Sequence, residues 1–208
     1  MRVIKSVVTT DTILTSSNIP EDEYPAWVSG TSYTALDKVI YEHKIYERIV
    51  TGAGTTPPDL DQINWLDSGY TNRYRMFDNI ISSVSSRTGG IEFTLTPNQV
   101  INGIALLNVN ASTVRVVMND PIEGVVYDRT KGLRSSSNVI DYYSYFFAPL
   151  INLGDLDTAI FLDLPNKPTA TIAVYVSSGV GLVEVGEVVY GIQSIVGRTN
   201  YGTAIGIT

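Results

Sequence analysis

Hydrophobic and polar residues alternate over short stretches of this chain, and no long segment repeats hydrophobic residues at helical spacing. The stretch IEFTLT at 91–96 alternates strictly, which is typical of a strand with one buried face. The stretch INGIALLNV at 101–109 is almost continuously apolar and predicts a buried strand. Gly, Pro, Asn and Asp interrupt such runs at intervals of about 8–12 residues. The chain is therefore expected to be mainly β, with residues 70–176 forming a jelly-roll-like antiparallel β-sandwich.

Three further segments differ from the expected sandwich. Residues 1–23 contain one short strand pattern and then a turn-rich acidic stretch, and they predict an N-terminal arm used as a linker or in assembly. Residues 24–69 are dense in aromatic side chains and predict a small three-stranded β module with a tight turn at His43 and Lys44. Residues 177–208 are rich in glycine and predict an assembly segment that ends in an unpaired edge strand.

Composition and charge narrow the functional classes. The 208 residues carry 14 Lys+Arg against 21 Asp+Glu, a formal net charge of −7, which lacks the basic surface that binding nucleic acid or an anionic membrane requires. With no Cys and one His, the sequence offers no thiolate nucleophile and no His- or Cys-rich metal site, so we expect no metal or cofactor. No apolar run approaches the roughly 20 residues of a membrane span. We expect a soluble protein made without a secretion signal.

The sequence gives little evidence for catalytic residues. The carboxylates at 21–23, Asp59 and Asp61 are conceivable partners in glycoside hydrolysis, but they lie in turn-rich segments that we expect to be exposed. Exposure leaves a carboxyl without the burial that would tune its pKa for catalysis. His43 has no nucleophile to serve and is better explained as a turn residue. We expect no catalytic residues and no enzyme, and a polysaccharide depolymerase is the weakest alternative.

The aromatic residues of 24–69 are the strongest candidates for a binding site. Sugars stack their C–H faces on aromatic rings while their hydroxyl groups bond to polar neighbours. The pattern W-x5-Y-x3-D-x3-Y-x4-Y, followed by a later Trp, resembles small chitin- and cellulose-binding modules. The resemblance implies a carbohydrate-binding site on Trp27, Tyr33, Tyr46 and Trp65. The alternative is that these rings form the core that so small a module needs.

A second resemblance spans most of the chain. The order TSSNIPEDEYPAW, GTSYTALDKVIYEHKIYE, TNRYRMFD and GEVVYGIQSIVGRTNYGTAIGI is similar to that of tailed-bacteriophage virion proteins from tails, baseplates and collars. It implies a structural component of the phage particle, assembled in the host cytoplasm, with other virion proteins as partners. It also implies a homo-oligomer, a trimer or a ring, that adapts the tail to its fibres. A module that recognises host surface glycan is the alternative function.

The motif TNRYRMFD at 71–78 is the segment where we expect the module to contact the sandwich. In an extended chain, Arg73 and Arg75 project to one side, and Phe77 then turns the chain. Arginine pairs strongly with carboxylates, which are abundant in this acidic protein. The sequence therefore predicts interdomain contacts by Arg73, Arg75 and Phe77, the alternative being a plain linker anchored by Phe77.

Overall fold

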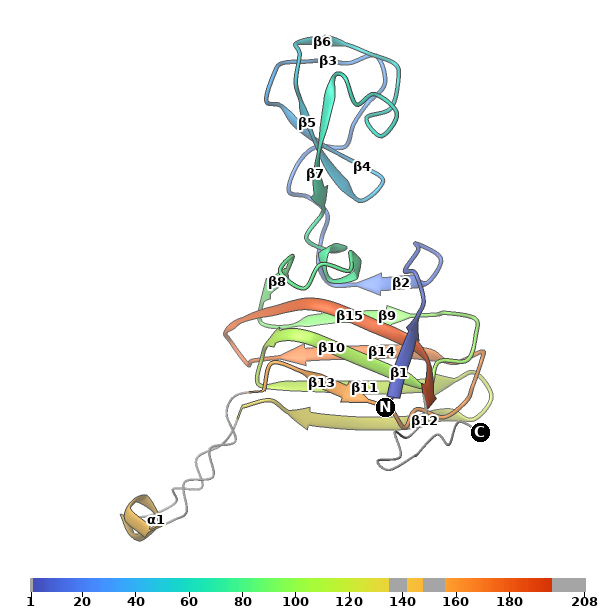
Figure 1. Cartoon of the computed structure of the whole chain (residues 1–208), viewed down its shortest axis with the longest axis vertical. Helices are drawn as coiled ribbons and strands as arrows, with labels where there is room; N and C mark the ends of the chain where they lie inside the picture. The colour runs from blue at the N-terminus through green and yellow to red at the C-terminus, as the bar shows by residue number, and fades with distance from the viewer. Residues whose placement is uncertain (1, 135–141, 148–155, 196–208) are drawn as a thin grey trace, which may run out of the picture.

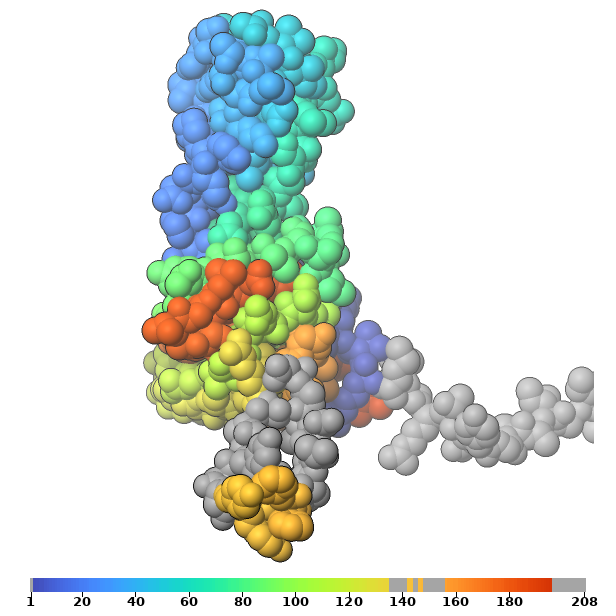
Figure 2. Space-filling model, turned by 90° about the vertical axis from the view of Figure 1, so that its left-hand side faces the viewer, coloured from blue at the N-terminus to red at the C-terminus, as the bar shows by residue number. Residues whose placement is uncertain are grey.

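The protein consists of a β-sandwich and a smaller β module that stands on one end of it (Figure 1). The computed structural model describes residues 2–134, 142–147 and 156–195. Figure 2 shows the module, coloured blue to green, above the sandwich in a second view. Within the described residues, no helix has the length and apolar character to cross a membrane. The predicted fold class, mainly β with an antiparallel sandwich, is confirmed.

Two antiparallel sheets form the sandwich. In the described part of the chain, the first has the strand order β1-β15-β10-β13, with β8 also paired to β15, and the second has the order β12-β11-β14-β9-β2. The strands of the first sheet are β1 (Arg2–Ser6), β8 (Ser85–Thr88), β10 (Gly103–Asn110), β13 (Ala159–Phe161) and β15 (Leu182–Ile195). Those of the second are β2 (Leu14–Ser17), β9 (Ile91–Leu95), β11 (Thr113–Asp120), β12 (Gly124–Gly132) and β14 (Thr171–Ser177).

The core of the sandwich comes from residues that face inward from both sheets. Buried and more exposed residues alternate along β9, β11 and β14, as period-two strands with one covered face require. The apolar run predicted as a buried strand is β10, where Ile104 and Leu106 have no exposed surface. Each such side chain contributes about 1.5–3 kcal/mol when it is fully buried. This apolar contact is the main force that holds the two sheets together.

The module is inserted between β2 and β8. Its strands are β3 (Ser32–Tyr33), β4 (Lys38–Tyr41), β5 (Lys44–Arg48), β6 (Gly52–Ala53) and β7 (Trp65–Tyr70). Strands β4, β5 and β7 form the predicted three-stranded sheet, and β3 pairs with β6 beside it. The turn between β4 and β5 consists of Glu42 and His43, with φ angles of 45° and 65°, which is typical of a two-residue hairpin loop. The predicted turn is thus shifted by one residue, and Lys44 begins β5.

Two short helices accompany these strands in the described ranges. After β7, the chain returns to the sandwich through η1 (Arg75–Phe77), whose Met76 is fully buried in the sandwich core. The second helix, α1 (Tyr142–Phe147), lies apart from both sheets in Figure 1. The first of these helices therefore fixes the end of the module's connection to the sandwich.

The predicted N-terminal arm is largely part of the sandwich. Strand β1 pairs with the end of β15, from Arg2 opposite Ile195 to Ser6 opposite Gly191, and β2 pairs with β9. Sequence reasoning missed this arrangement because both strands are short and their partners lie far along the chain. The segment at 1–23 therefore differs from a free arm, and only its last residues connect to the module.

The glycine-rich segment predicted from residue 177 is, in part, an interior strand. Strand β15 pairs with β10 along one side and with β8 and β1 along the other. Two of its glycines allow close packing: a Cβ at Gly186 would lie 2.7 Å from the Asn108 Cβ, and one at Gly191 would overlap the Lys5 carbonyl oxygen. These glycines complete the sandwich instead of leaving it open. The predicted unpaired edge falls in 196–208, outside the described residues.

Candidate functional site

The module has a hollow of about 490 Å³ on its surface. Strands β5 and β7 supply one wall, and the loop that precedes β7 supplies the other. The lining residues are Lys44, Tyr46, Pro58, Asp59, Gln62, Trp65, Leu66 and Asp67. Apolar and polar side chains thus meet in one concave surface, which is the usual composition of a small-molecule site.

An ion pair fixes one side of this hollow. Lys44 Nζ lies 2.6 Å from Asp67 Oδ2 across the paired strands β5 and β7, and it also lies 5.1 Å from the centre of the Tyr70 ring. Burial alone would raise the pKa of Asp67, but hydrogen bonds from Lys44 and the Gly69 N–H lower it below its usual value. The same hydrogen bond raises the pKa of Lys44. Both groups are therefore charged at neutral pH and hold each other in place.

Two of the four predicted sugar-binding rings line the hollow, and both are buried. Tyr46 is 5% exposed and Trp65 is 3% exposed. The Trp65 ring meets the edge of Tyr33, with 5.2 Å between ring centres, and the Arg48 guanidinium lies 4.9 Å from its centre. Neither ring presents an open face on which a sugar could stack. The small module has few other large side chains to bury, which is the physical reason for this difference from an exposed platform.

The other two predicted rings lie outside the lining of the hollow. Trp27 is half-buried and meets Tyr41 edge-on at 5.4 Å between ring centres. Tyr33 is also half-buried, and its hydroxyl oxygen accepts a hydrogen bond from the Val28 N–H at 2.8 Å. Both pack against the module core of Val39, Tyr46 and Trp65. The predicted alternative, in which the rings form the core, matches this packing.

Of the polar residues in the hollow, sequence reasoning named Asp59, as a carboxylate for hydrolysis, and missed Lys44, Gln62 and Asp67. Lys44 precedes Tyr46 by two residues on β5, and Trp65 precedes Asp67 by two on β7, so each pair lies on one face of the sheet. That spacing is visible in the sequence once the two strands are paired. Gln62 gives no such signal because it comes from a loop.

The structure separates the carboxylates considered for hydrolysis. Asp59 lines the hollow, while Asp61 accepts hydrogen bonds from the side-chain amide of Asn64 at 2.9 Å. Glu21 lies at the junction with the sandwich, and its side chain is 15% exposed, in contrast to the exposed loop that we expected. Among the described side chains, no cluster of three His, Cys, Asp or Glu is arranged to hold a metal ion.

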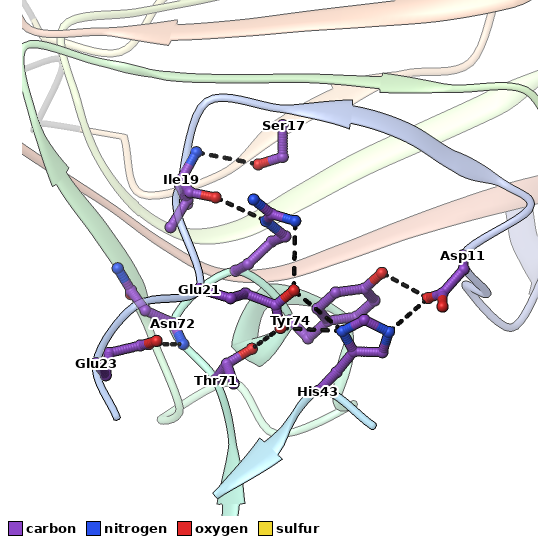
Figure 3. Close-up of polar contacts among 10 residues, drawn as sticks. Asp11, Ser17, Ile19, Glu21, Glu23, His43, Thr71, Asn72 and Tyr74 are labelled. Carbon is purple, nitrogen blue, oxygen red and sulfur yellow. Dashed lines mark hydrogen bonds and ion pairs between the residues drawn. The ribbon is translucent and has the colours of Figure 1, made fainter. Parts of the chain in front are cut away.

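A polar cluster joins the module to the sandwich (Figure 3). At its centre, Glu21 accepts hydrogen bonds from the Thr71 hydroxyl at 2.7 Å and from His43 at 2.9 Å, and one of its oxygens lies 3.3 Å from the Arg73 guanidinium. The Arg73 Nε donates to the Ile19 carbonyl oxygen at 2.6 Å. These contacts tie the two connecting segments to each other at the base of the module.

The three residues predicted at the interdomain contact have different positions. Arg73 belongs to the polar cluster, whereas Arg75 Nε donates to the Tyr70 carbonyl oxygen at 3.2 Å, within the connecting segment. Phe77 packs edge-on against Phe93 of β9, with 5.6 Å between ring centres. Arg73 and Phe77 therefore reach beyond their own segment, and Arg75 holds that segment's local shape.

Comparisons with known proteins give low similarities. No family model matches the sequence, and neither does any curated protein. The lectin domain of lectinolysin complexed with Lewis B antigen is 11% identical, with 56% of this chain and 80% of that chain covered and a TM-score of 0.38. An F5/8 type C domain from Bacteroides fragilis is 10% identical, covering 57% and 79%, with a TM-score of 0.36. CpGH89CBM32-5 from Clostridium perfringens, in complex with GalNAc-β-1,3-galactose, is 12% identical, with 58% of this chain and 83% of that chain covered and a TM-score of 0.36. These values are too low to assign the chain to a family.

Proposed function

We propose that the protein is a non-catalytic carbohydrate-binding protein whose binding site is the hollow on the module. The supporting observation is the presence, in that one hollow, of the fixed Lys44–Asp67 pair, the polar side chains of Asp59 and Gln62, and apolar surface. This combination suits a sugar, because its hydroxyl groups bond to carboxylates and amides while its C–H groups contact apolar side chains. The aliphatic residues of the lining are Leu66, which is exposed, and Pro58, which is buried.

The charge of the hollow favours one class of sugar. Two carboxylates and one ammonium group line it, and the whole chain has a net charge of −7. A uronic acid or a sialic acid would place a further negative charge there and would be repelled. We therefore expect a neutral saccharide or one that contains an amino sugar.

Substitutions in the hollow test this proposal. With a saccharide selected on an array of neutral, amino and acidic glycans, Asp59→Asn and Gln62→Ala should each weaken binding about tenfold, because each removes a hydrogen-bond partner. Isothermal titration calorimetry measures the change. Asp22→Asn, an equivalent substitution at an exposed position outside the hollow, serves as the control and should bind like the wild type. Failure of every glycan to bind, or wild-type affinity of both variants, would contradict the proposal.

A second candidate function is that of a tailed-phage virion subunit, with α1 as an assembly element. It is supported by the aromatic side chains of Tyr142, Tyr143 and Phe147 on α1, all largely exposed on a helix that lies apart from both sheets. Exposed apolar clusters of this kind commonly mark contacts between proteins. In such a particle, the module would present its hollow to a host glycan.

Oligomeric state tests this second function. We expect analytical ultracentrifugation to give a trimer or a larger ring, and the triple variant Tyr142→Ser, Tyr143→Ser and Phe147→Ser to shift it towards monomer. Ile122→Ser, which removes an exposed apolar side chain from the sandwich, is the control and should leave the oligomer intact. A wild-type protein that stays monomeric at high concentration would count against an assembly role.

A further inference from the structure

The single histidine of the chain lies between two carboxylates that come from outside its own hairpin. His43 forms the tip of the β4–β5 turn, and its Nε2 lies 2.7 Å from Asp11 Oδ1 in the turn that joins β1 to β2 of the sandwich. Its Nδ1 lies 2.9 Å and 3.1 Å from the two carboxylate oxygens of Glu21, in the segment that leads into the module (Figure 3). Both ring nitrogens are therefore at hydrogen-bond distance from a carboxylate.

This geometry specifies the protonation state of the ring. A neutral imidazole has one N–H donor and one acceptor nitrogen, whereas a carboxylate can only accept. With both carboxylates ionised, a neutral His43 would satisfy one of them and turn its lone pair towards the other. Only the imidazolium ion donates to both Asp11 and Glu21.

The groups that surround His43 balance its positive charge. The Tyr74 ring stacks on the imidazole, with 4.0 Å between ring centres, and the Tyr74 hydroxyl donates to Asp11 Oδ1 at 2.7 Å. Burial and the nearby Asp11 carboxylate raise the pKa of Tyr74, so this hydroxyl remains a donor. Glu21 also accepts from the Thr71 hydroxyl and faces the Arg73 guanidinium. Two carboxylates and two cations thus neutralise each other when the ring is protonated.

The contact with Asp11 differs from the other polar contacts at the junction. Thr71, Arg73 and Glu21 all belong to the two segments through which the chain enters and leaves the module. Asp11 belongs to the sandwich itself, in the turn that joins β1 to β2 on the side of the sandwich that faces the module (Figure 1). The ion pair between His43 and Asp11 is thus a non-covalent contact that holds the module to the sandwich, in addition to the two covalent connections of the chain.

We propose that His43 is a pH-sensitive latch: its imidazolium ion fixes the module on the sandwich through Asp11 and Glu21, and loss of the ring proton releases the module. This inference concerns how the module is held, and it does not depend on what the hollow binds.

The direction of the pH dependence follows from the surroundings. Burial alone would lower the pKa of His43, but the hydrogen bonds and charges of Asp11 and Glu21 outweigh it and raise the pKa above the usual 6.5. The hydrogen bonds from His43 and Tyr74 lower the pKa of Asp11 below 3.8. A raised histidine pKa stabilises the junction fully below 6.5, and the effect is lost as pH rises through the pKa of the folded state. At the acid end, the contribution of Asp11 is lost as pH falls through its lowered pKa.

Nuclear magnetic resonance measures this protonation directly. Because the full chain has one histidine, its imidazole ¹³C and ¹⁵N signals need no assignment. We expect a titration midpoint above 6.5, with both nitrogens protonated below it. Glu21→Gln should lower the midpoint more than Asp11→Asn, because the side chain of Glu21 is 15% exposed and that of Asp11 is 67% exposed. A midpoint at or below 6.5 in the wild type would overturn the proposal.

Distance measurements test the release. The chain has no cysteine, so Thr56→Cys in the module and Thr130→Cys on β12 give two specific spin-label sites, both exposed. We expect a narrow distance distribution at about pH 6 that broadens at about pH 9. His43→Gln in the labelled chain should be broad at both values, while the control Asp22→Asn should behave like its parent. If His43→Gln fails to fold, the comparison between the two pH values in the parent decides. A distribution that is unchanged by pH would refute the latch.

Discussion

Substitution of Trp65 by alanine is expected to unfold the module while the sandwich stays folded. Trp65 is 3% exposed, and with Val39 and Tyr46 it makes up the buried core of the module. Its ring also packs against Tyr33 and the Arg48 guanidinium. Truncation of a buried tryptophan costs about 3–5 kcal/mol, and a module this small has little stability in reserve. Urea unfolding followed by nuclear magnetic resonance, with separate signals from module and sandwich, measures the loss.

The neighbouring residue provides the matched control for Trp65→Ala. Leu66 follows on the same strand with an exposed side chain, so Leu66→Ala should change stability by no more than about 0.5 kcal/mol. A folded Trp65→Ala module with native chemical shifts would contradict the account of its core. The expected unfolding also means that loss of sugar binding in Trp65→Ala could not identify a stacking surface, which is why the binding test uses Asp59 and Gln62.

Substitution of Gly191 by alanine is expected to detach β1 from the sandwich. The added Cβ would overlap the carbonyl oxygen of Lys5 and lie 3.4 Å from the Cα of Ser6, both backbone atoms of β1. A flexible side chain could rotate away, but a paired strand can only move as a unit. Overpacking of this kind costs about 1–3 kcal/mol, and we expect the upper end of that range. Hydrogen exchange at the amides of Val3 and Lys5, with the free energy of unfolding from urea, measures the effect.

The control for Gly191→Ala is a strand glycine with space around it. A Cβ at Gly132, in β12, would meet no atom within 4 Å, so Gly132→Ala should leave β1 protected. Wild-type protection of the β1 amides in Gly191→Ala would show that the strands are not packed as closely as described here.

The alternation of hydrophobic residues was sufficient to predict the class of fold. The strict pattern at 91–96 and the apolar run at 101–109 correspond to β9 and β10, and the three-stranded sheet of the module was also predicted. The pairing of β1 with β15 could not be predicted, because it joins the two ends of the described chain. The role of Gly191 depends on that pairing, and so its sequence context suggested an open segment.

The candidate site was predicted only in part, because burial is decided by tertiary contacts. Tyr46 and Trp65 do line the hollow, but the sequence could not show that Arg48 and Tyr33 pack against the Trp65 ring. The burial of Glu21 was missed for the same reason, since its partners His43 and Thr71 lie far along the chain. The virion role and the absence of catalysis remain predictions.

Chemical-shift mapping tests most directly whether the hollow of the module is a carbohydrate-binding site. Addition of a neutral or amino-sugar-containing oligosaccharide to the ¹⁵N-labelled chain should shift the amide signals of Asp59, Gln62, Leu66 and Asp67 in a saturable manner, while those of the sandwich strands stay in place. Saturable shifts confined to the sandwich, or unchanged spectra with every oligosaccharide tried, would contradict the assignment of the site.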